Sequence, residues 1–163
     1  MSRTELDRTV QPSLLDRLTD EDPRDSADRA VSREASTKAF RMAVQRDVQD
    51  LLNTRRSIVP VSAAHPELRR SVHEFGLPDT SGISMATGEG RQQLTDDIAD
   101  TVRRFEPRLM NVAVRLLDAD QVKAPQVRFA VEATLRMDPS PERIVFDTVL
   151  EIASGTYAVD DAS

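Results

Sequence analysis

The chain has 163 residues and a net charge of −6, which suits one folded domain with a well-solvated exterior. It contains no cysteine, so disulfides, thiolate metal sites and a cysteine nucleophile are excluded. No apolar run is long enough to cross a bilayer, so we expect no membrane insertion. The acidic balance disfavours nucleic acid as a partner, because binding phosphates requires a concentrated basic surface. Only three short stretches are locally basic: Arg55-Arg56, Arg69-Arg70 and Arg103-Arg104.

Residues 1–36 differ in composition from the rest of the chain, and we expect them to form a flexible N-terminal tail. Within residues 12–18, Leu14, Leu15 and Leu18 lie on one side of about one helical turn. The stretch that follows is highly charged and almost without large apolar residues, which predicts a solvated linker. Two interpretations stay open: the leucines fold back onto the domain, or they form a short docking segment for another protein.

Three helices are predicted in the first half of the folded domain, which we expect to span residues 37–159, with a C-terminal tail at residues 160–163. Apolar side chains recur at three- and four-residue spacing in the first and third helices, residues 37–53 and 92–105. A shorter helix is predicted over residues 66–75, followed by a glycine-rich loop. The buried side of this shorter helix is predicted to consist of Leu68, Val72 and Phe75.

After the third helix, the spacing of apolar residues changes from helical to strand-like. Strands are predicted at residues 109–116, 126–137 and 143–153, and their short connections indicate an antiparallel meander. Helices on one face of this sheet make a two-layer α+β fold. The last strand is apolar on both faces, because Val145 and Val149 lie on its second face, which suits a surface covered on assembly. The edges of the meander offer unpaired backbone groups to a strand of another chain.

No motif of a phosphate loop, a dinucleotide site, a serine hydrolase or a zinc protease is present. We therefore expect no cofactor, no metal ion and no small-molecule substrate. Glu106 is the one candidate for a catalytic carboxylate, as the general acid of a glycoside hydrolase. The lack of tryptophan argues against this chemistry, because sugar clefts commonly use aromatic platforms.

Glu106, Pro107 and Arg108 form a charged triplet where the third helix meets the first strand. The proline ends the helix and holds the preceding residue in an extended conformation. In this bend Arg108 can offer a fork of donors, and Glu106 two acceptor oxygens, to a partner protein. The alternative is an intramolecular salt bridge that closes the corner, and the chemistry of these residues alone slightly favours it.

Several motifs occur in a fixed order over most of residues 12–159: PSLLDRL, DVQDLLNTRR, HEFGLPDTSG, FEPRL, VRFAVEATL and VFDTVLEIASGTY. This ordered set resembles the TssE family, the baseplate wedge subunits of the bacterial type VI secretion system. That family is related to phage-tail baseplate wedge proteins that historically carry a lysozyme-like label. The resemblance implies a non-enzymatic structural protein in the cytoplasm.

The resemblance also implies partners. These are the baseplate proteins TssF, TssG and TssK and the sheath subunits TssB and TssC, with the strands of the family providing a template for sheath polymerisation. In this family the Glu-Pro-Arg triplet contacts the wedge, which assigns Glu106, Pro107 and Arg108 to partner binding. Two alternatives remain: a peptidoglycan hydrolase that uses Glu106, and the wedge subunit of a related phage-like contractile tail.

Overall fold

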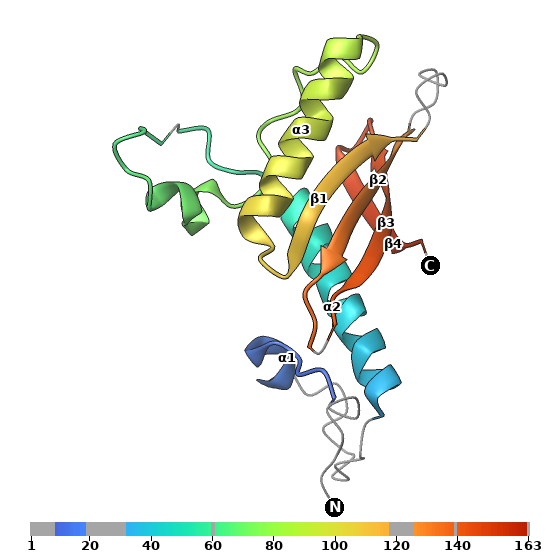
Figure 1. Ribbon diagram of the computed structural model, residues 1–163. Helices are drawn as coiled ribbons and strands as arrows, with labels where there is room; N and C mark the ends of the chain where they lie inside the picture. The colour runs from blue at the N-terminus through green and yellow to red at the C-terminus, as the bar shows by residue number, and fades with distance from the viewer. Residues whose placement is uncertain (1–8, 19–31, 60, 118–125, 139, 163) are drawn as a thin grey trace, which may run out of the picture.

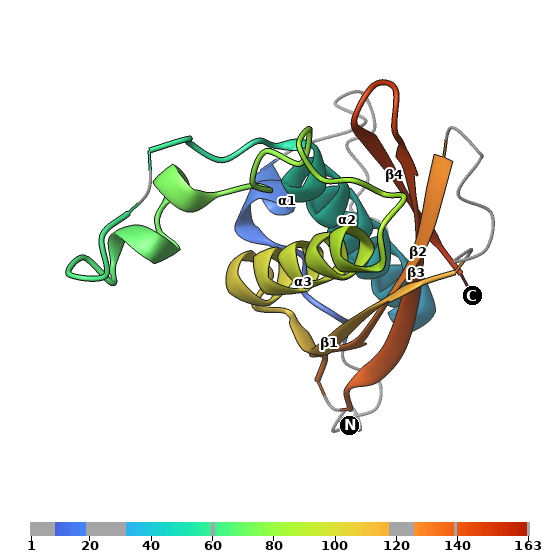
Figure 2. The same ribbon diagram turned by 90° about the horizontal axis from the view of Figure 1, so that it is seen from above.

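The computed structural model describes residues 9–18, 32–59, 61–117, 126–138 and 140–162. Its elements are α1 (Leu14–Leu18), α2 (Arg33–Asn53), η2 (Leu68–Arg70), η3 (Val72–Glu74), α3 (Gly88–Phe105), β1 (Leu109–Leu116), β2 (Gln126–Leu135), β3 (Glu142–Glu151) and β4 (Thr156–Asp161). Residues 19–31 of the predicted linker lie outside the described residues, whereas residues 33–36, also predicted to be linker, form the first turn of α2. α2 and α3 lie on one side of the sheet, so the α+β class is confirmed (Figures 1 and 2).

The sheet has four antiparallel strands in the order β1-β2-β3-β4, so the prediction of three strands is wrong. The missed strand is β4, whose Tyr157 and Val159 are buried and alternate with exposed residues. It reaches Asp161, within the stretch predicted to be a C-terminal tail. β3 is therefore paired on both sides, and its predicted position at an edge of the sheet is also wrong. The edges are β1 and β4.

Both long helices, α2 and α3, begin about four residues earlier than predicted, and each is preceded by a side-chain N-cap. The hydroxyl of Ser32 accepts a hydrogen bond from the backbone N–H of Ala35 at 3.2 Å, and α2 begins directly after it. The hydroxyl of Thr87 accepts one from the N–H of Gly90 at 3.1 Å. The last three residues of the stretch predicted to be a glycine-rich loop, 88–90, therefore belong to the first turn of α3.

The core lies between the helices and the inner face of the sheet. Its largest fully buried apolar side chains are Phe129, Phe146, Leu94, Ile98, Leu135 and Ile144. The sheet residues alternate along β2 and β3 as predicted, because successive strand side chains point to opposite faces. Burial of this apolar surface is the main force that holds the two layers together. Among the described residues, no helix is long and apolar enough to cross a membrane.

Residues 54–77, which we call the arm, extend away from the body of the molecule and return to it (Figures 1 and 2). The arm is described except for residue 60. The predicted helix is absent: the segment forms two short 3-10 turns, η2 and η3. Leu68 and Val72 are 47% and 89% exposed, so their predicted burial is wrong, and only Phe75 packs against the core.

The two ends of the arm are joined at its base. The N–H of Leu77 donates to the carbonyl of Thr54 at 2.8 Å, and the N–H of Arg56 donates to the carbonyl of Leu77 at 2.9 Å. Gly76 has a φ of 102°, and a Cβ atom there would lie 2.2 Å from the carbonyl oxygen of Thr54. Only glycine fits this crossing, which fixes where the arm leaves and re-enters the fold.

Candidate functional site

The triplet of Glu106, Pro107 and Arg108 forms the corner between α3 and β1. The N–H of Glu106 donates to the carbonyl of Val102 at 2.9 Å, which is the last hydrogen bond of the helix. The carbonyl of Arg108 accepts from the N–H of Arg136 at 2.8 Å, so the sheet begins immediately. The corner is therefore held by backbone hydrogen bonds on both sides of the proline.

The side chains of the corner form an internal ion-pair cluster. Nε of Arg108 donates to Oε1 of Glu106 at 2.6 Å, and Nη2 contacts Oε2 of the same carboxylate. Nη2 also donates to Oδ2 of Asp47, on α2, at 2.6 Å. Hydrogen bonding to Glu106, and then to Asp47, raises the pKa of Arg108 above its ordinary value. The intramolecular salt bridge that the sequence left open is present, and Asp47 is a third member that the sequence did not reveal.

In this arrangement the carboxylate of Glu106 is not accessible as the general acid of a glycoside hydrolase. Its side chain is buried, with the residue 4% exposed, and both of its oxygens face Arg108. The carboxylate nearest to it in this cluster, Asp47, shares the same guanidinium and does not face it across an open cleft. A glycosidic oxygen would have to displace the arginine fork in order to reach Glu106.

Pro107 is the part of the triplet that reaches the surface. It is exposed, whereas the side chain of Arg108 is 23% exposed. Pro107 borders a shallow groove that is otherwise lined by Pro66 and by arginines of the arm and of α3. Any partner that touches the triplet therefore meets Pro107 and the outer edge of Arg108, with Glu106 behind them.

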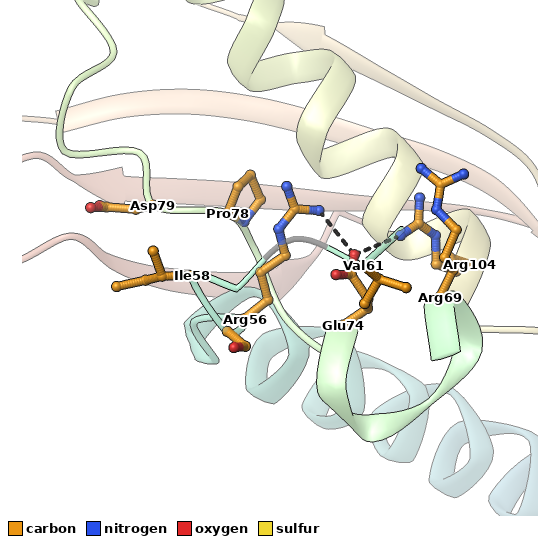
Figure 3. Close-up of a pocket in the computed structure, with 9 residues that line it drawn as sticks. Arg56, Ile58, Val61, Arg69, Glu74, Pro78, Asp79 and Arg104 are labelled. Atoms are coloured by element: carbon orange, nitrogen blue, oxygen red, sulfur yellow. Dashed lines mark ion pairs between the residues drawn. The ribbon is translucent and has the colours of Figure 1, made fainter. Parts of the chain in front are cut away.

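A second buried carboxylate, that of Glu74 in η3, lies beside the same end of α3, and the sequence analysis missed it. Nη1 of Arg56 and Nη1 of Arg104 each lie 3.5 Å from Oε2 of Glu74, and Figure 3 shows both guanidinium groups turned toward it. The ring of Phe75 packs edge-on against that of Phe105 at 5.4 Å between centroids, which holds η3 against the end of α3. Arg56, Arg69 and Arg104 line one pocket around Glu74. The structure thus brings together one member of each of the three arginine pairs, which are far apart in the sequence.

The outer face of the sheet presents Val145 and Val149, both half-buried in the isolated chain. Val145 lies opposite Glu132 and Val149 opposite Arg128 on β2. The two valines are therefore apolar positions within a face that is otherwise rich in ion pairs, such as that of Arg143 with Glu132 at 3.1 Å. Neither valine is sealed inside the fold.

The outward backbone groups of β4 are occupied by three amide side chains of α2, which we call the amide row: Gln45, Gln49 and Asn53. Gln45 donates to the carbonyl of Val159 at 2.7 Å, and Gln49 accepts from its N–H at 3.2 Å. Asn53 both accepts from the N–H of Tyr157 at 2.9 Å and donates to its carbonyl at 2.8 Å. The expectation of unpaired groups is wrong for this part of the edge. The only feature of the sequence that indicates this contact is the four-residue spacing of the amides, which places them on one side of α2.

The predicted docking segment forms α1, and its leucines face outward. Leu14, Leu15 and Leu18 are 70%, 68% and 74% exposed. The helix is attached through its polar side, where Oδ1 of Asp16 accepts from Arg46 of α2 at 2.7 Å. Hydrogen bonds from Ser13 and Arg46 lower the pKa of Asp16.

A cofactor or metal site is not indicated by the side chains. Among the residues that the structure describes, no group of histidine, aspartate and glutamate could hold a metal ion. The acidic residues of the corner and of the Glu74 cluster are paired with arginines. Both clusters are thus suited to holding backbone segments in place and to presenting charge.

Comparison with known families decides how these surfaces are to be interpreted. The family model described as baseplate wedge protein gp25 matches residues 38–140, more than half of the chain. The chain belongs to the gp25 family of baseplate wedge proteins. The match includes the arm, α3, the corner, β1 and β2, but not α1 or β4.

Membership of the gp25 family gives the chain a structural role in a phage-tail-like baseplate, with other baseplate proteins as partners. TssE is the type VI secretion homologue of gp25, so the resemblance seen in the sequence motifs is confirmed. Comparisons with curated proteins and with solved structures gave no match.

Proposed function

We propose that this gp25-family protein is the TssE-type wedge subunit of a type VI secretion system. It joins the wedge proteins TssF and TssG, together with TssK, to the first ring of the TssB and TssC sheath, and it acts in the cytoplasm without catalysis. The observation that carries this proposal is that Glu106 is buried and forms an ion pair with Arg108 of the same chain. Its carboxylate holds Arg108 and is not available for reaction.

The wedge contact is assigned to the corner. Glu106 and Asp47 hold the guanidinium of Arg108 from two sides, so that the charge is presented in a fixed geometry with little entropy left to lose on binding. Pro107 and the exposed edge of Arg108 make the contact. Glu106 acts as a positioning residue through Arg108.

The sheath contact is assigned to β4 and to the outer face of the sheet. An incoming strand would replace the hydrogen bonds of the amide row with backbone hydrogen bonds along β4. Val145 and Val149 would be covered by the same neighbour, which would bury apolar area that the isolated chain leaves half open. This exchange gives sheath polymerisation its first strand pairing.

The leucines of α1 form a separate docking element. Leu14, Leu15 and Leu18 are exposed on a helix that is fixed to α2 by its polar side, so their apolar surface is directed toward a neighbour. A partner with an apolar groove is the expected occupant.

Copurification tests the proposal directly. Tagged chain is recovered from cells that make TssF, TssG, TssK, TssB and TssC, and we expect all five to accompany it. The double variant Pro107→Ala/Arg108→Lys keeps the positive charge at the corner but loses the rigid bend and the fork, so recovery of TssF and TssG should fall about tenfold. The control Arg128→Lys lies on the sheet, away from the corner, and should leave the recovery of TssF and TssG unchanged. Full recovery with the corner variant contradicts the assignment.

A wedge subunit of another phage-like contractile tail is the second candidate. It is supported by the family description, which names a baseplate wedge protein without naming the machine. The same purification separates the two candidates, because the identity of the sheath protein that accompanies the chain differs between them.

A further inference from the structure

An arginine-rich groove lies beside the corner, between the arm and the end of α3. Arg56, Arg69 and Arg104 line a pocket of about 360 Å³ together with Glu74 and Asp79. Arg69, Arg70, Arg103 and Arg104 line an adjoining groove that continues to Pro107. The two hollows share Arg69 and Arg104, so they form one surface, which we call the basic groove.

The basic groove is positioned by rigid parts of the fold. Arg56 is fixed by the joined base of the arm, where its N–H donates to the carbonyl of Leu77 at 2.9 Å. Arg104 is fixed by the last turn of α3, and its guanidinium lies 5.9 Å from the centre of the Phe105 ring. Arg103 also lines the groove, but its guanidinium donates to the carbonyl of Val112 and to Asp100, so its charge is already paired.

Among the described residues, the positive charge of the groove is only partly neutralised. Asp79, which also lines the first pocket, pairs with Arg55 at 3.1 Å. Arg56 and Arg104 share the single carboxylate of Glu74 at 3.5 Å, which is too long for a full hydrogen bond. Within the described part of the chain, Arg69 and Arg70 have no carboxylate partner. This excess lies on a molecule whose net charge is −6, so it stands out from an acidic background.

Apolar side chains border these arginines. Ile58 and Val72 are 92% and 89% exposed, and Leu68, next to Arg69, is 47% exposed. Ile58 also lines the first pocket and Pro66 the second. Exposed apolar side chains on the same arm as incompletely paired arginines are typical of a protein-binding surface, where arginine is enriched and lysine is depleted.

We propose that the basic groove is a docking surface for an acidic amphipathic segment of a partner protein. Carboxylates of that segment bind Arg69 and Arg70 and complete the partial pairing of Arg56 and Arg104. Its apolar side chains cover Ile58, Leu68 and Val72. The inference does not depend on which machine contains the chain, and it adds a contact of defined chemistry beside the triplet.

A protein partner fits the groove better than nucleic acid does. Glu74 already places a carboxylate between two of the arginines, so the spacing of the guanidinium groups suits carboxylates. Nucleic acid requires a continuous basic face, whereas these arginines are interrupted by Ile58, Val61 and Pro66. The net charge of −6 would also repel a long polyanion.

Fluorescence anisotropy with the full chain tests this surface. The probe is a dye-labelled amphipathic peptide of repeating Glu-Glu-Leu-Leu units, titrated at low and at physiological ionic strength. Arg69→Gln/Arg70→Gln should weaken binding about fivefold, the size expected for two exposed ion pairs. Arg115→Gln/Arg128→Gln removes the same charge from the sheet and should leave the affinity unchanged. All four arginines are exposed, so both variants should fold.

Chemical shifts of the arginine side chains give an independent result. The peptide should perturb Arg56, Arg69, Arg70 and Arg104 and leave Arg115 and Arg128 unperturbed. Absence of binding, equal weakening in both double variants, or tighter binding to duplex DNA or to phosphatidylglycerol vesicles would overturn the inference. The peptide assay contains no wedge or sheath protein, so its failure is distinct from a failure of the proposed function.

Discussion

Glu106 is almost entirely buried, and its charge is balanced by one side chain two residues further along the chain. Arg108 is in turn shared with Asp47, which is 61 residues away in sequence, and its guanidinium lies 5.9 Å from the centre of the Phe40 ring. The corner therefore connects α2, α3 and β1 through a single cation. Removing one partner from such a cluster leaves a charge that the fold has largely withdrawn from water.

Glu106→Gln should lower the free energy of unfolding by about 2 kcal/mol. This is less than the loss for a fully buried ion pair, because the side chain of Arg108 keeps 23% of its exposure to water. Urea denaturation followed by circular dichroism measures the change. Glu67→Gln, at an exposed position on the arm, is the control and should change stability by less than about 0.5 kcal/mol. Equal stability of the two variants would contradict the structural role of the corner.

The alkaline titration of Tyr157 reports on the packing of β4. Burial raises the pKa of this single tyrosine to about 12, from an ordinary value of 10.0. The unfolded state thus loses its proton first, so the stability contributed by Tyr157 is fully present below about pH 10 and is lost as the pH rises through about 12. Tyrosinate absorbance should titrate near 12 in buffer and near 10 in urea. A midpoint near 10 in the folded protein would show that the ring of Tyr157 is exposed, so that β4 is not packed against α2.

At the scale of elements, the amide row is a substitute for a fifth strand. Edge strands expose backbone groups that can pair with another copy of the chain, and proteins commonly cover them. Here Gln45, Gln49 and Asn53 of α2 cover the outward groups of β4 with side-chain amides. The side-chain amides satisfy the backbone groups of β4 while the subunit is free. A strand of a neighbouring chain can replace these hydrogen bonds without disturbing the apolar core.

Gln45→Ala/Gln49→Ala should uncover the backbone of Val159 and promote self-association through β4. Stability should fall by about 1 kcal/mol for each lost hydrogen bond. Sedimentation velocity over a range of concentrations measures the association. Gln92→Ala/Gln93→Ala, on the exposed side of α3, is the matched control and should remain monomeric. A monomeric Gln45→Ala/Gln49→Ala variant would show that the amide row does not protect the edge.

The sequence predicted the elements whose pattern is local and missed those that depend on distant partners. Apart from the first turns of both helices, the residues of α2 and α3 were predicted correctly, and so was the alternation in β2 and β3, since each element buries a regular apolar face. β4 was missed because its pattern is short, with Tyr157 and Val159 as its only buried residues. The predicted helix in the arm is absent because no neighbour covers Leu68 and Val72.

The triplet was found in the sequence because it interrupts a helical pattern. The third member of its ion-pair cluster, Asp47, could not be predicted from the sequence. Asp47 lies within a helix, and nothing in its spacing indicates that it reaches Arg108. Likewise, Glu74 is one acidic residue in a polar stretch until the fold places Arg56 and Arg104 around it. Contacts between residues far apart in sequence require the three-dimensional fold.

At the scale of the whole molecule, the arm and β4 lie on opposite sides of the body (Figures 1 and 2). The corner and the basic groove are at the side of the arm, whereas the amide row is at the side of β4. A subunit of this shape can bind two neighbours at once, one on each side. This separation suits a protein that connects the wedge to the sheath.

In the proposed function, the outer face of the sheet and β4 start the sheath while the corner stays bound to the wedge. The most direct measurement is the number of fluorescent TssB sheaths per cell in a strain whose only wedge subunit of this family is Val145→Glu/Val149→Glu. We predict that TssF and TssG still copurify with this variant and that sheaths are absent, whereas Val145→Thr/Val149→Thr supports normal sheath numbers. Normal sheath numbers with the glutamate variant would contradict the account.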